Sequence, residues 1–294
     1  MTTMQPDNQT TILRPEWLSE RAWPFEIRTA LIGGTPIAFT DEGSGPTLLL
    51  VHDGMCSYLW VHLIQLLRDR FRVVTLDFPG SGLSPEGALR PGLETDSRIL
   101  EGLVAHLDLT DLTLVVHDLG GGVGLGLATR HPDLIAGLAL INTFAWPATT
   151  PGLRGMLRLM GSPLMTAINS RTNLVARATS GRFGVGRHFD REQKDAFLAM
   201  FRHKTSRQRF NSLIASAITE SEYLSGVEGR LDQLAAKPAL MIFGKRNDPF
   251  RFQGKWRAHF PDVEQMVVQG GYHFPMCDDP DGVAERIALW RGNR

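Results

Sequence analysis

The sequence has few cysteines, no excess charge of either sign and no long hydrophobic run. Its 294 residues include 31 Lys and Arg and 31 Asp and Glu, so the formal net charge is zero. A nucleic-acid-binding protein usually carries a net basic face, so this balance argues against a nucleic-acid partner. No apolar run approaches the ~20 residues that a transmembrane helix needs. The first residues lack the basic and apolar blocks of a signal peptide, and we therefore expect a cytoplasmic protein with no membrane partner.

Several common kinds of site are also missing. Cys56 and Cys277 form neither a disulfide framework nor a C-x-x-C metal pair, and we expect no metal. No G-x-S-x-G motif occurs, which argues against an ordinary serine esterase. The glycines between Gly120 and Gly126 do not follow the G-x-G-x-x-G spacing of a dinucleotide-binding loop. We therefore expect no cofactor.

Short apolar runs and helical patterns alternate along most of the chain. Such alternation is typical of βαβ units and a parallel sheet, and it predicts an α/β fold. We expect helices at 57–70, 94–107 and 280–290. Strands are expected at 28–32 and 36–40, as a hairpin, and at 48–51, 72–76, 112–116, 135–141, 239–243 and 263–268.

The alternation stops between residues 146 and 232. This segment has no convincing strand, and we expect a helical insertion that divides the core into residues 1–145 and 233–294. Between Arg171 and Arg209 it has ten Lys and Arg against three acids. Either these side chains attract an anionic or polyphenolic substrate, or they form a solvated helical face.

The strongest local signal is an acid at the end of a strand. The run Val115-Val116-His117-Asp118 is followed by Leu119 and a series of glycines. This is the context of a nucleophile elbow, in which a strained turn holds the reactive side chain and glycines allow strand and helix to pack closely. The backbone N–H of Leu119 would stabilise an oxyanion. The alternative interpretation of Asp118 is a cap at the start of the next helix.

An Asp at an elbow implies a different reaction from that of a Ser. Asp118 would attack an sp³ carbon that bears a leaving group, and water activated by a histidine would cleave the resulting alkyl-enzyme ester. The chain order nucleophile, acid, histidine makes His273, after two glycines, the expected base. Asp248 is the expected orienting acid, with its neighbour Asn247 as the residue that would otherwise take this place. A turn-forming Asp before Pro is the alternative interpretation of Asp248.

These motifs resemble the α/β-hydrolase superfamily, and within it the haloalkane dehalogenase and epoxide hydrolase branch, which uses an Asp nucleophile. The likeness covers the full length and is carried by residues 41–46, 57–60, 77–84 and 142–147. It implies an α/β-hydrolase fold with a mostly parallel eight-stranded sheet and an inserted helical cap. It also implies a cofactor-free, dehalogenase-like hydrolase that acts on a small hydrophobic organic substrate. The alternatives are an epoxide hydrolase with the same triad and a repurposed, non-hydrolytic biosynthetic protein.

Three departures from that branch bear on the leaving group. Dehalogenases place a Trp directly after the nucleophile, where it donates to the departing halide, but Leu119 has no such donor. The loop after the third strand reads His52-Asp53-Gly54 instead of His-Gly-Asn-Pro or His-Gly-x-Pro, so a carboxylate replaces a halide-binding amide. Epoxide hydrolases of this kind use two cap tyrosines, and only Tyr223 lies in this cap.

Asp53 is the least expected residue of the group. Two carboxylates that face one pocket raise the pKa of one of them, and we predict that Asp53 is a neutral acid beside the nucleophile Asp118. The alternative is that Asp53 points away or bonds to the backbone. The N–H of Asp53 or Gly54 is expected to complete the oxyanion hole, and the substrate pocket is expected to include Phe144, Trp146 and Tyr223.

Overall fold

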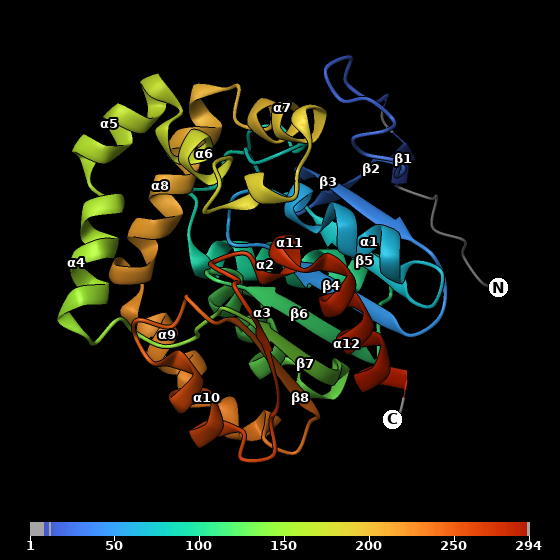
Figure 1. The fold of residues 1–294 in the computed structure, drawn as a ribbon, viewed down its shortest axis with the longest axis vertical. Helices are drawn as coiled ribbons and strands as arrows, with labels where there is room; N and C mark the ends of the chain where they lie inside the picture. Colours follow the sequence, from blue (N-terminus) through green and yellow to red (C-terminus); the bar gives the residue numbers. More distant parts are fainter. Residues whose placement is uncertain (1–8, 12, 293–294) are drawn as a thin grey trace.

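A mixed sheet with helices on both faces forms the centre of the molecule (Figure 1). The computed structural model describes residues 9–11 and 13–292. Nine strands lie in the order β1-β2-β3-β5-β4-β6-β7-β8-β9. They are β1 (Gln9–Thr11), β2 (Arg28–Ile32), β3 (Thr35–Glu42), β4 (Thr47–Val51), β5 (Arg72–Leu76), β6 (Leu112–His117), β7 (Ile135–Ile141), β8 (Ala239–Gly244) and β9 (Glu264–Val268).

The strands β4 to β9 pair in parallel, and β1, β2 and β3 add an antiparallel edge. This confirms the mostly parallel sheet, and all eight expected strands are present. The ninth, β1, pairs with β2 and was not expected. It has only three residues, too few to show a repeating apolar pattern.

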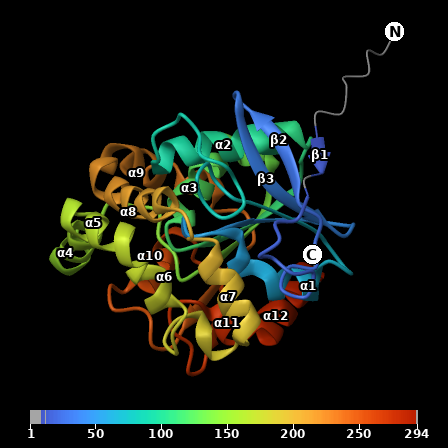
Figure 2. The ribbon, with the colours of Figure 1, turned by 90° about the horizontal axis from the view of Figure 1, so that it is seen from above.

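Helices cover the sheet so completely that its central strands have no solvent-facing side. Every residue of β6 and β8 is buried, as in parallel sheets that carry helices on both faces. Seen from above, one face carries α2 (Leu93–His106) and α3 (Gly120–Arg130), as Figure 2 shows. The other carries α1 (Val61–Leu67), α11 (Pro275–Asp278) and α12 (Pro280–Gly292).

Between β7 and β8 the described chain contains helices and no strand. The helices α4 and α5 pack on α8 in a layer beside the sheet (Figures 1 and 2). The last of them, α9, packs on α3 of the core, so the limits of the insertion at 146 and 232 stay a prediction. None of the described helices combines the length and the apolar character needed to cross a membrane. The helices of this segment are α4 (Pro151–Met160), α5 (Pro163–Thr172), α6 (Leu174–Thr179), α7 (Arg191–Ala199), α8 (Lys204–Thr219) and α9 (Ser221–Glu228).

A buried ion pair joins this helical cap to the core. Arg209 of α8 donates through Nη2 to both carboxylate oxygens of Asp96 on α2, at 2.7 and 2.6 Å. Its Nε donates to the carbonyl of Pro79 at 2.6 Å. Burial raises the pKa of Asp96, and the charge of Arg209 opposes that rise. The pair therefore fixes α8 over the core at the expense of two buried charges.

Candidate active site

Five loops meet at the carboxyl edge of the parallel strands. The strands β4, β6, β7, β8 and β9 are neighbours in the sheet in this order. Ligands of open α/β sheets bind outside the carboxyl ends of the strands, so these loops form the candidate site. In chain order, they carry Asp53, Asp118, Asn142, Asn247 and His273.

Asp118 lies in a strained turn between β6 and α3. Its φ of 47° is in the left-handed region, where a residue with a Cβ costs roughly 1–2 kcal/mol. The hydroxyl of Thr143 donates to the carbonyl of Asp118 at 2.6 Å and helps to hold the turn. A Cβ on Gly121 would lie 2.1 Å from Thr143 Oγ1, so the turn requires glycine there. No side chain caps α3, and the interpretation of Asp118 as a helix cap is therefore wrong.

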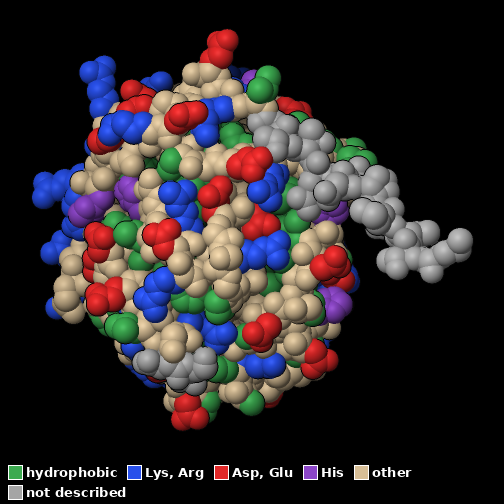
Figure 3. Space-filling model, turned by 90° about the vertical axis from the view of Figure 1, so that its right-hand side faces the viewer, with side chains coloured by type: hydrophobic (Ala, Val, Ile, Leu, Met, Phe, Trp, Pro, Cys, Tyr) green, Lys and Arg blue, Asp and Glu red, His purple; other side chains and the backbone are tan. Residues whose placement is uncertain are grey.

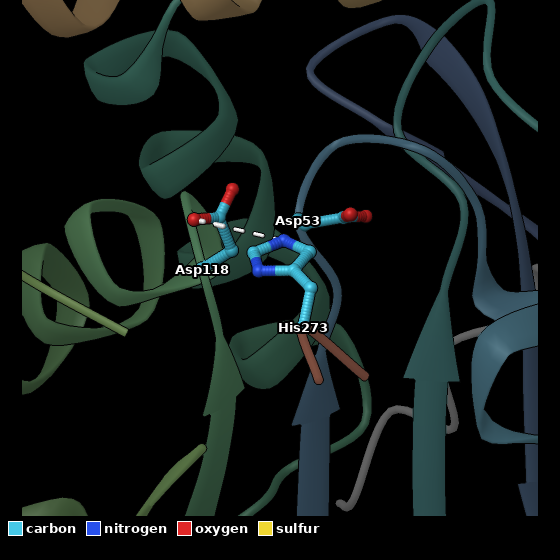
Figure 4. A group of neighbouring side chains, drawn as sticks. All are labelled: Asp53, Asp118 and His273. Atoms are coloured by element: carbon cyan, nitrogen blue, oxygen red, sulfur yellow. Dashed lines mark ion pairs between the residues drawn. The ribbon is translucent and has the colours of Figure 1, made fainter. Parts of the chain in front are cut away.

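The imidazole of His273 faces Asp118 (Figure 4). Its Nε2 is 4.0 Å from Asp118 Oδ1, and the two side chains are 36% and 26% exposed. The backbone of His273 is held by two side chains of the core. Its carbonyl accepts a hydrogen bond from Asn142 Nδ2 at 2.9 Å and lies 2.8 Å from Nε2 of His117. Because a carbonyl only accepts, His117 carries a proton on Nε2.

The expected orienting acid does not contact His273. Asp248 Oδ1 accepts a hydrogen bond from the backbone N–H of Phe252 at 2.6 Å, and its Oδ2 accepts one from Gln253 Nε2 at 3.0 Å. Asp248 thus satisfies the free N–H groups at the start of α10 (Phe252–His259), as carboxylates do at helix N-termini. The side chain beside the imidazole is that of Asn247, whose Nδ2 is 3.4 Å from His273 Nδ1. The expectation for Asp248 is corrected accordingly.

Asp53 lies inside the molecule next to both of these residues. One carboxylate oxygen of Asp53, one of Asp118 and one ring nitrogen of His273 lie within 4.8 Å of one another, and Figure 4 shows the imidazole between the two carboxyl groups. Asp53 is 2% exposed. Burial, followed by the charge of Asp118, raises its pKa well above the usual range. Among the described residues this is also the one group that could hold a metal ion.

The hydrogen bonds of the Asp53 loop settle two further expectations. Asp53 Oδ1 accepts a hydrogen bond from the N–H of Met55 at 3.0 Å, so this carboxyl bonds to backbone; Figure 4 shows it directed away from Asp118, although the two carboxyl groups have oxygens within 4.8 Å of each other. The N–H of Gly54 donates to His52 Nδ1 at 3.0 Å and is not free for an oxyanion, so the expectation for Gly54 is wrong. Burial raises the pKa of Asp118, while His273 and the N–H of Leu119 lower it.

A cavity of about 390 Å³ opens beside Asp118 and His273. Its volume is that of a site for a small organic ligand. Phe144 lines it, as expected, and so does Leu119. The polar part of its wall is Asp118, Asn142, Asn247, Asp248 and His273, and the rest is mostly apolar: Leu153, Met156, Leu157, Met160, Phe210, Ile214, Pro249, Phe250 and Phe252.

Two residues expected in the pocket pack elsewhere. Trp146 is buried against Trp256, with 4.6 Å between the ring centroids, and Lys255 Nζ lies 4.5 Å from its ring. The hydroxyl of Tyr223 donates to the carbonyl of Gly122 at 2.9 Å, so this side chain is directed into α3. Both side chains stabilise the junction of cap and core and do not line the cavity.

Asn142 is the residue of this site that the motifs did not reveal. Its Nδ2 donates to the carbonyls of Tyr272 and His273 at 2.8 and 2.9 Å, and its Oδ1 accepts from the N–H of Gly244 at 3.1 Å. The side chain therefore joins the loops after β8 and β9. A non-glycine residue that ends a strand at a φ of 38° is the signal that points to it, but φ is not visible in a sequence.

Comparison with known proteins identifies the family. A family model described as alpha/beta hydrolase fold matches residues 46–280. The chain belongs to the α/β-hydrolase family. Within it, the chain lies in the branch of the haloalkane dehalogenases and is a hydrolase.

Similar proteins of this α/β-hydrolase branch carry more than one activity. Haloalkane dehalogenase 2 of Mycobacterium tuberculosis is 30% identical over 90% of this chain and 94% of its own length. A cis-3-alkyl-4-alkyloxetan-2-one decarboxylase of Shewanella oneidensis is 26% identical, covering 90% of this chain and 87% of its own. The haloalkane dehalogenase structure from Bradyrhizobium elkani has a TM-score of 0.80 at 20% identity, covering 91% of this chain and 97% of its own. An epoxide hydrolase structure has a TM-score of 0.79 at 21% identity, covering 91% and 98%.

Proposed function

We propose that the protein opens a strained oxygen ring, such as an epoxide, by forming an ester between a ring carbon and Asp118. One observation carries the proposal: a carboxylate on a strained turn has the Nε2 of His273 4.0 Å from its Oδ1. An imidazole in that position can activate the water that cleaves the ester. The mostly apolar cavity of about 390 Å³ suits a small or medium hydrophobic substrate.

The surroundings of Asp118 favour a leaving oxygen over the leaving halide of a dehalogenase. Stabilising a developing anion requires N–H or O–H donors, and the loss of one donor costs about 2.7–4 kcal/mol. Leu119 offers no side-chain donor, and Trp146 does not line the cavity. An alkoxide, in contrast, can take a proton. Asp53 is buried and does not line the cavity, so its side chain has to turn toward Asp118 to donate this proton; its raised pKa and its closeness to Asp118 support it as the acid.

In the proposed reaction, Asp53 gives up one proton in the first step and receives one from Asp118 in the last. Asp118 bonds to the ring carbon as the ring C–O bond breaks, and Asp53 gives its proton to the released oxygen. His273 then takes a proton from water, and the hydroxide attacks Cγ of the Asp118 ester. The N–H of Leu119 stabilises the resulting oxyanion, and the product oxygen leaves with the proton from His273. Asp118 is left protonated and returns its proton to Asp53, so one water is consumed and a diol is formed.

Asn247, and not Asp248, is proposed to orient His273. The amide group of Asn247 has its Nδ2 beside Nδ1; turned by 180°, it presents its oxygen, which can accept the Nδ1 proton of the imidazole and leave Nε2 free to act as a base. An amide carries no negative charge, however, and does not stabilise the imidazolium that forms when water is deprotonated. We therefore expect cleavage of the ester to be slower than its formation, so that the ester accumulates.

Intact-protein mass spectrometry tests this function. A His273→Gln variant is incubated with a terminal alkyl epoxide and, separately, with a 1-bromoalkane of the same chain length. We expect a gain equal to the mass of the whole epoxide, located on Asp118 by peptide mapping, and no gain in Asp118→Asn. An adduct that forms with the bromoalkane and not with the epoxide would indicate a dehalogenase instead. No adduct from an epoxide that demonstrably binds would overturn the proposal.

Non-hydrolytic opening of a four-membered lactone is the second candidate. The curated relatives include cis-3-alkyl-4-alkyloxetan-2-one decarboxylases. The specific observation that favours this reaction is the shortage of donors beside Asp118, because opening such a ring releases a carboxylate that needs no proton. Release of carbon dioxide and an alkene from a 2-oxetanone, in place of a hydroxy acid, would identify this reaction.

A further inference from the structure

The outer side of the helical cap exposes several large apolar side chains. Leu159 of α4 is 60% exposed, Leu164 and Ile168 of α5 are 70% and 38% exposed, and Leu174 of α6 is 44% exposed. Leu164, Ile168 and Arg171 follow the spacing i, i+4, i+7, which places them on one side of α5. Large apolar side chains exposed on neighbouring helices are a feature of surfaces that bind a partner or a membrane.

The charge of the same segment has a single sign. From residue 134 to residue 189 the chain has six Arg, no Lys and no Asp or Glu. The exposed arginines on α4, α5 and α6 form no ion pair with a described acid. These arginines and the four apolar residues together make up what we call the cap face: Arg154, Arg158, Leu159, Leu164, Ile168, Arg171, Leu174 and Arg177.

The opposite side of the molecule has a different surface. Figure 3 views the side that carries α1 and the antiparallel strands, where acidic and basic side chains are interspersed. There Arg72 pairs with Asp41 at 2.7 Å and Arg68 with Glu42 at 3.5 Å. Acidic partners thus lie next to arginines on this side, whereas the described residues of the cap face include none.

Contrary to the expectation of no membrane partner, we propose that the cap face binds the surface of a bilayer that contains anionic lipids. Arginines beside exposed leucines are the composition of helices that lie in a membrane interface, where the apolar side chains enter the lipid and the cations meet the headgroups. The ten-residue helices α4 and α5 are too short to span a bilayer but can lie along it. A second copy of this chain is a poorer occupant, because a twofold contact would bring the same arginines together.

Such docking would place the outer side of α4 on the lipid and its inner side on the cavity. The inner side of α4 lines the cavity through Leu153, Leu157 and Met160, while its outer side carries Arg158 and Leu159. Figures 1 and 2 show α4 and α5 at the outer edge of the molecule, away from α1 and α12. Helix α4 would then be the element that separates a hydrophobic substrate dissolved in the lipid from the cavity. The docking itself does not depend on the reaction proposed at Asp118.

Vesicle co-sedimentation with the full chain tests the proposal. The probes are vesicles of phosphatidylcholine alone and of phosphatidylcholine with a quarter phosphatidylglycerol, at low and at physiological salt. We expect binding to the anionic vesicles only, and weaker binding at the higher salt. The double variant Arg154→Gln/Arg158→Gln should lose about 25-fold in partition coefficient, at about fivefold for each arginine near the surface.

Matched variants separate the cap face from general charge and apolarity. Arg70→Gln/Arg257→Gln removes two exposed arginines of the core, and Leu66→Gln/Leu289→Gln removes two exposed leucines of α1 and α12. Neither should change the binding, whereas Leu164→Gln/Ile168→Gln should weaken it. Circular dichroism checks that each variant is folded. Equal binding to both vesicle types, no binding, or equal losses in the core variants would overturn the proposal. So would a change in oligomeric state of the cap variants without vesicle binding, which would indicate a second copy as the occupant.

Discussion

Replacing Asp53 with Asn keeps the size of the side chain and removes the proton that it is proposed to donate. One oxygen of Asp53 lies within 4.8 Å of an oxygen of Asp118. Two negative charges at about that distance repel by about 3.5 kcal/mol at an effective dielectric constant of about 20. Burial of Asp53 acts in the same direction, and both effects hold it in the neutral form while Asp118 is ionised. Without the acid, we expect ester formation to slow by about 10²- to 10⁴-fold.

The pH dependence of ester formation distinguishes proton donation by Asp53 from a structural role. With Asp53 present, the rate of ester formation should fall as the pH rises, because Asp53 loses its proton. In Asp53→Asn this decline should be absent. The measurement is single-turnover mass spectrometry of the Asp118 ester in the His273→Gln background, with and without the Asp53 substitution, from about pH 5 to about pH 9.

Unfolding measurements supply the control for Asp53→Asn. Asn can still accept the hydrogen bond from Met55, so the loop should keep its conformation. The pKa of Asp53 is raised in the folded state. Its contribution to the free energy of unfolding of the wild type is therefore fully present below about pH 4 and declines as the pH rises. The variant should therefore match the wild type in acid and exceed it at higher pH. An ester formation rate and pH profile equal to those of the enzyme with Asp53 would refute the reasoning.

Three further predictions concern Asn247, the buried ion pair of Arg209 with Asp96, and the buried carboxyl of Asp77. Asn247→Asp places a charge next to His273 and should speed ester cleavage about five- to tenfold, since that imidazole is partly exposed; steady-state accumulation of the ester reports it. Asp96→Asn leaves Arg209 buried without a counter-charge and should lower the free energy of unfolding in urea by about 3–5 kcal/mol, whereas a double change to Asp96→Leu/Arg209→Met should recover most of it. Burial raises the pKa of Asp77 to about 6, so its contribution to stability should be lost as the pH rises from about 4 through 6. The thermal midpoint of the wild type should fall over this pH range, and that of Asp77→Asn should not. The same pH dependence in both proteins would contradict the prediction.

The parts of the site that follow from chain order could be predicted from the sequence. Asp118 was recognisable because it stands directly between an apolar run and a series of glycines, which is the context of a nucleophile elbow. His273 was recognisable because the base follows the last strand, after glycines that free its loop. The strands were equally clear, since β6 and β8 are buried along their whole length and read as apolar runs.

The parts that depend on the direction of a side chain could not be predicted. Asp248 and Asn247 are neighbours in one loop, and the choice between them depends on where the N–H groups of α10 point. Trp146 and Tyr223 lie in the expected segment, but their rings meet Trp256 and α3 and not the cavity. Propensity and periodicity describe an element and the face it buries, and they do not describe a rotamer.

The bonding of Asn142 determines which residues of the His273 loop are free to change. Its amide contacts only main-chain atoms of the loops after β8 and β9, namely the carbonyls of Tyr272 and His273 and the N–H of Gly244. Because every residue has a carbonyl, the side chain at position 272 can be exchanged without loss of these bonds. Libraries that vary position 272 should therefore alter the surroundings of the proposed base, His273, while its backbone stays in place.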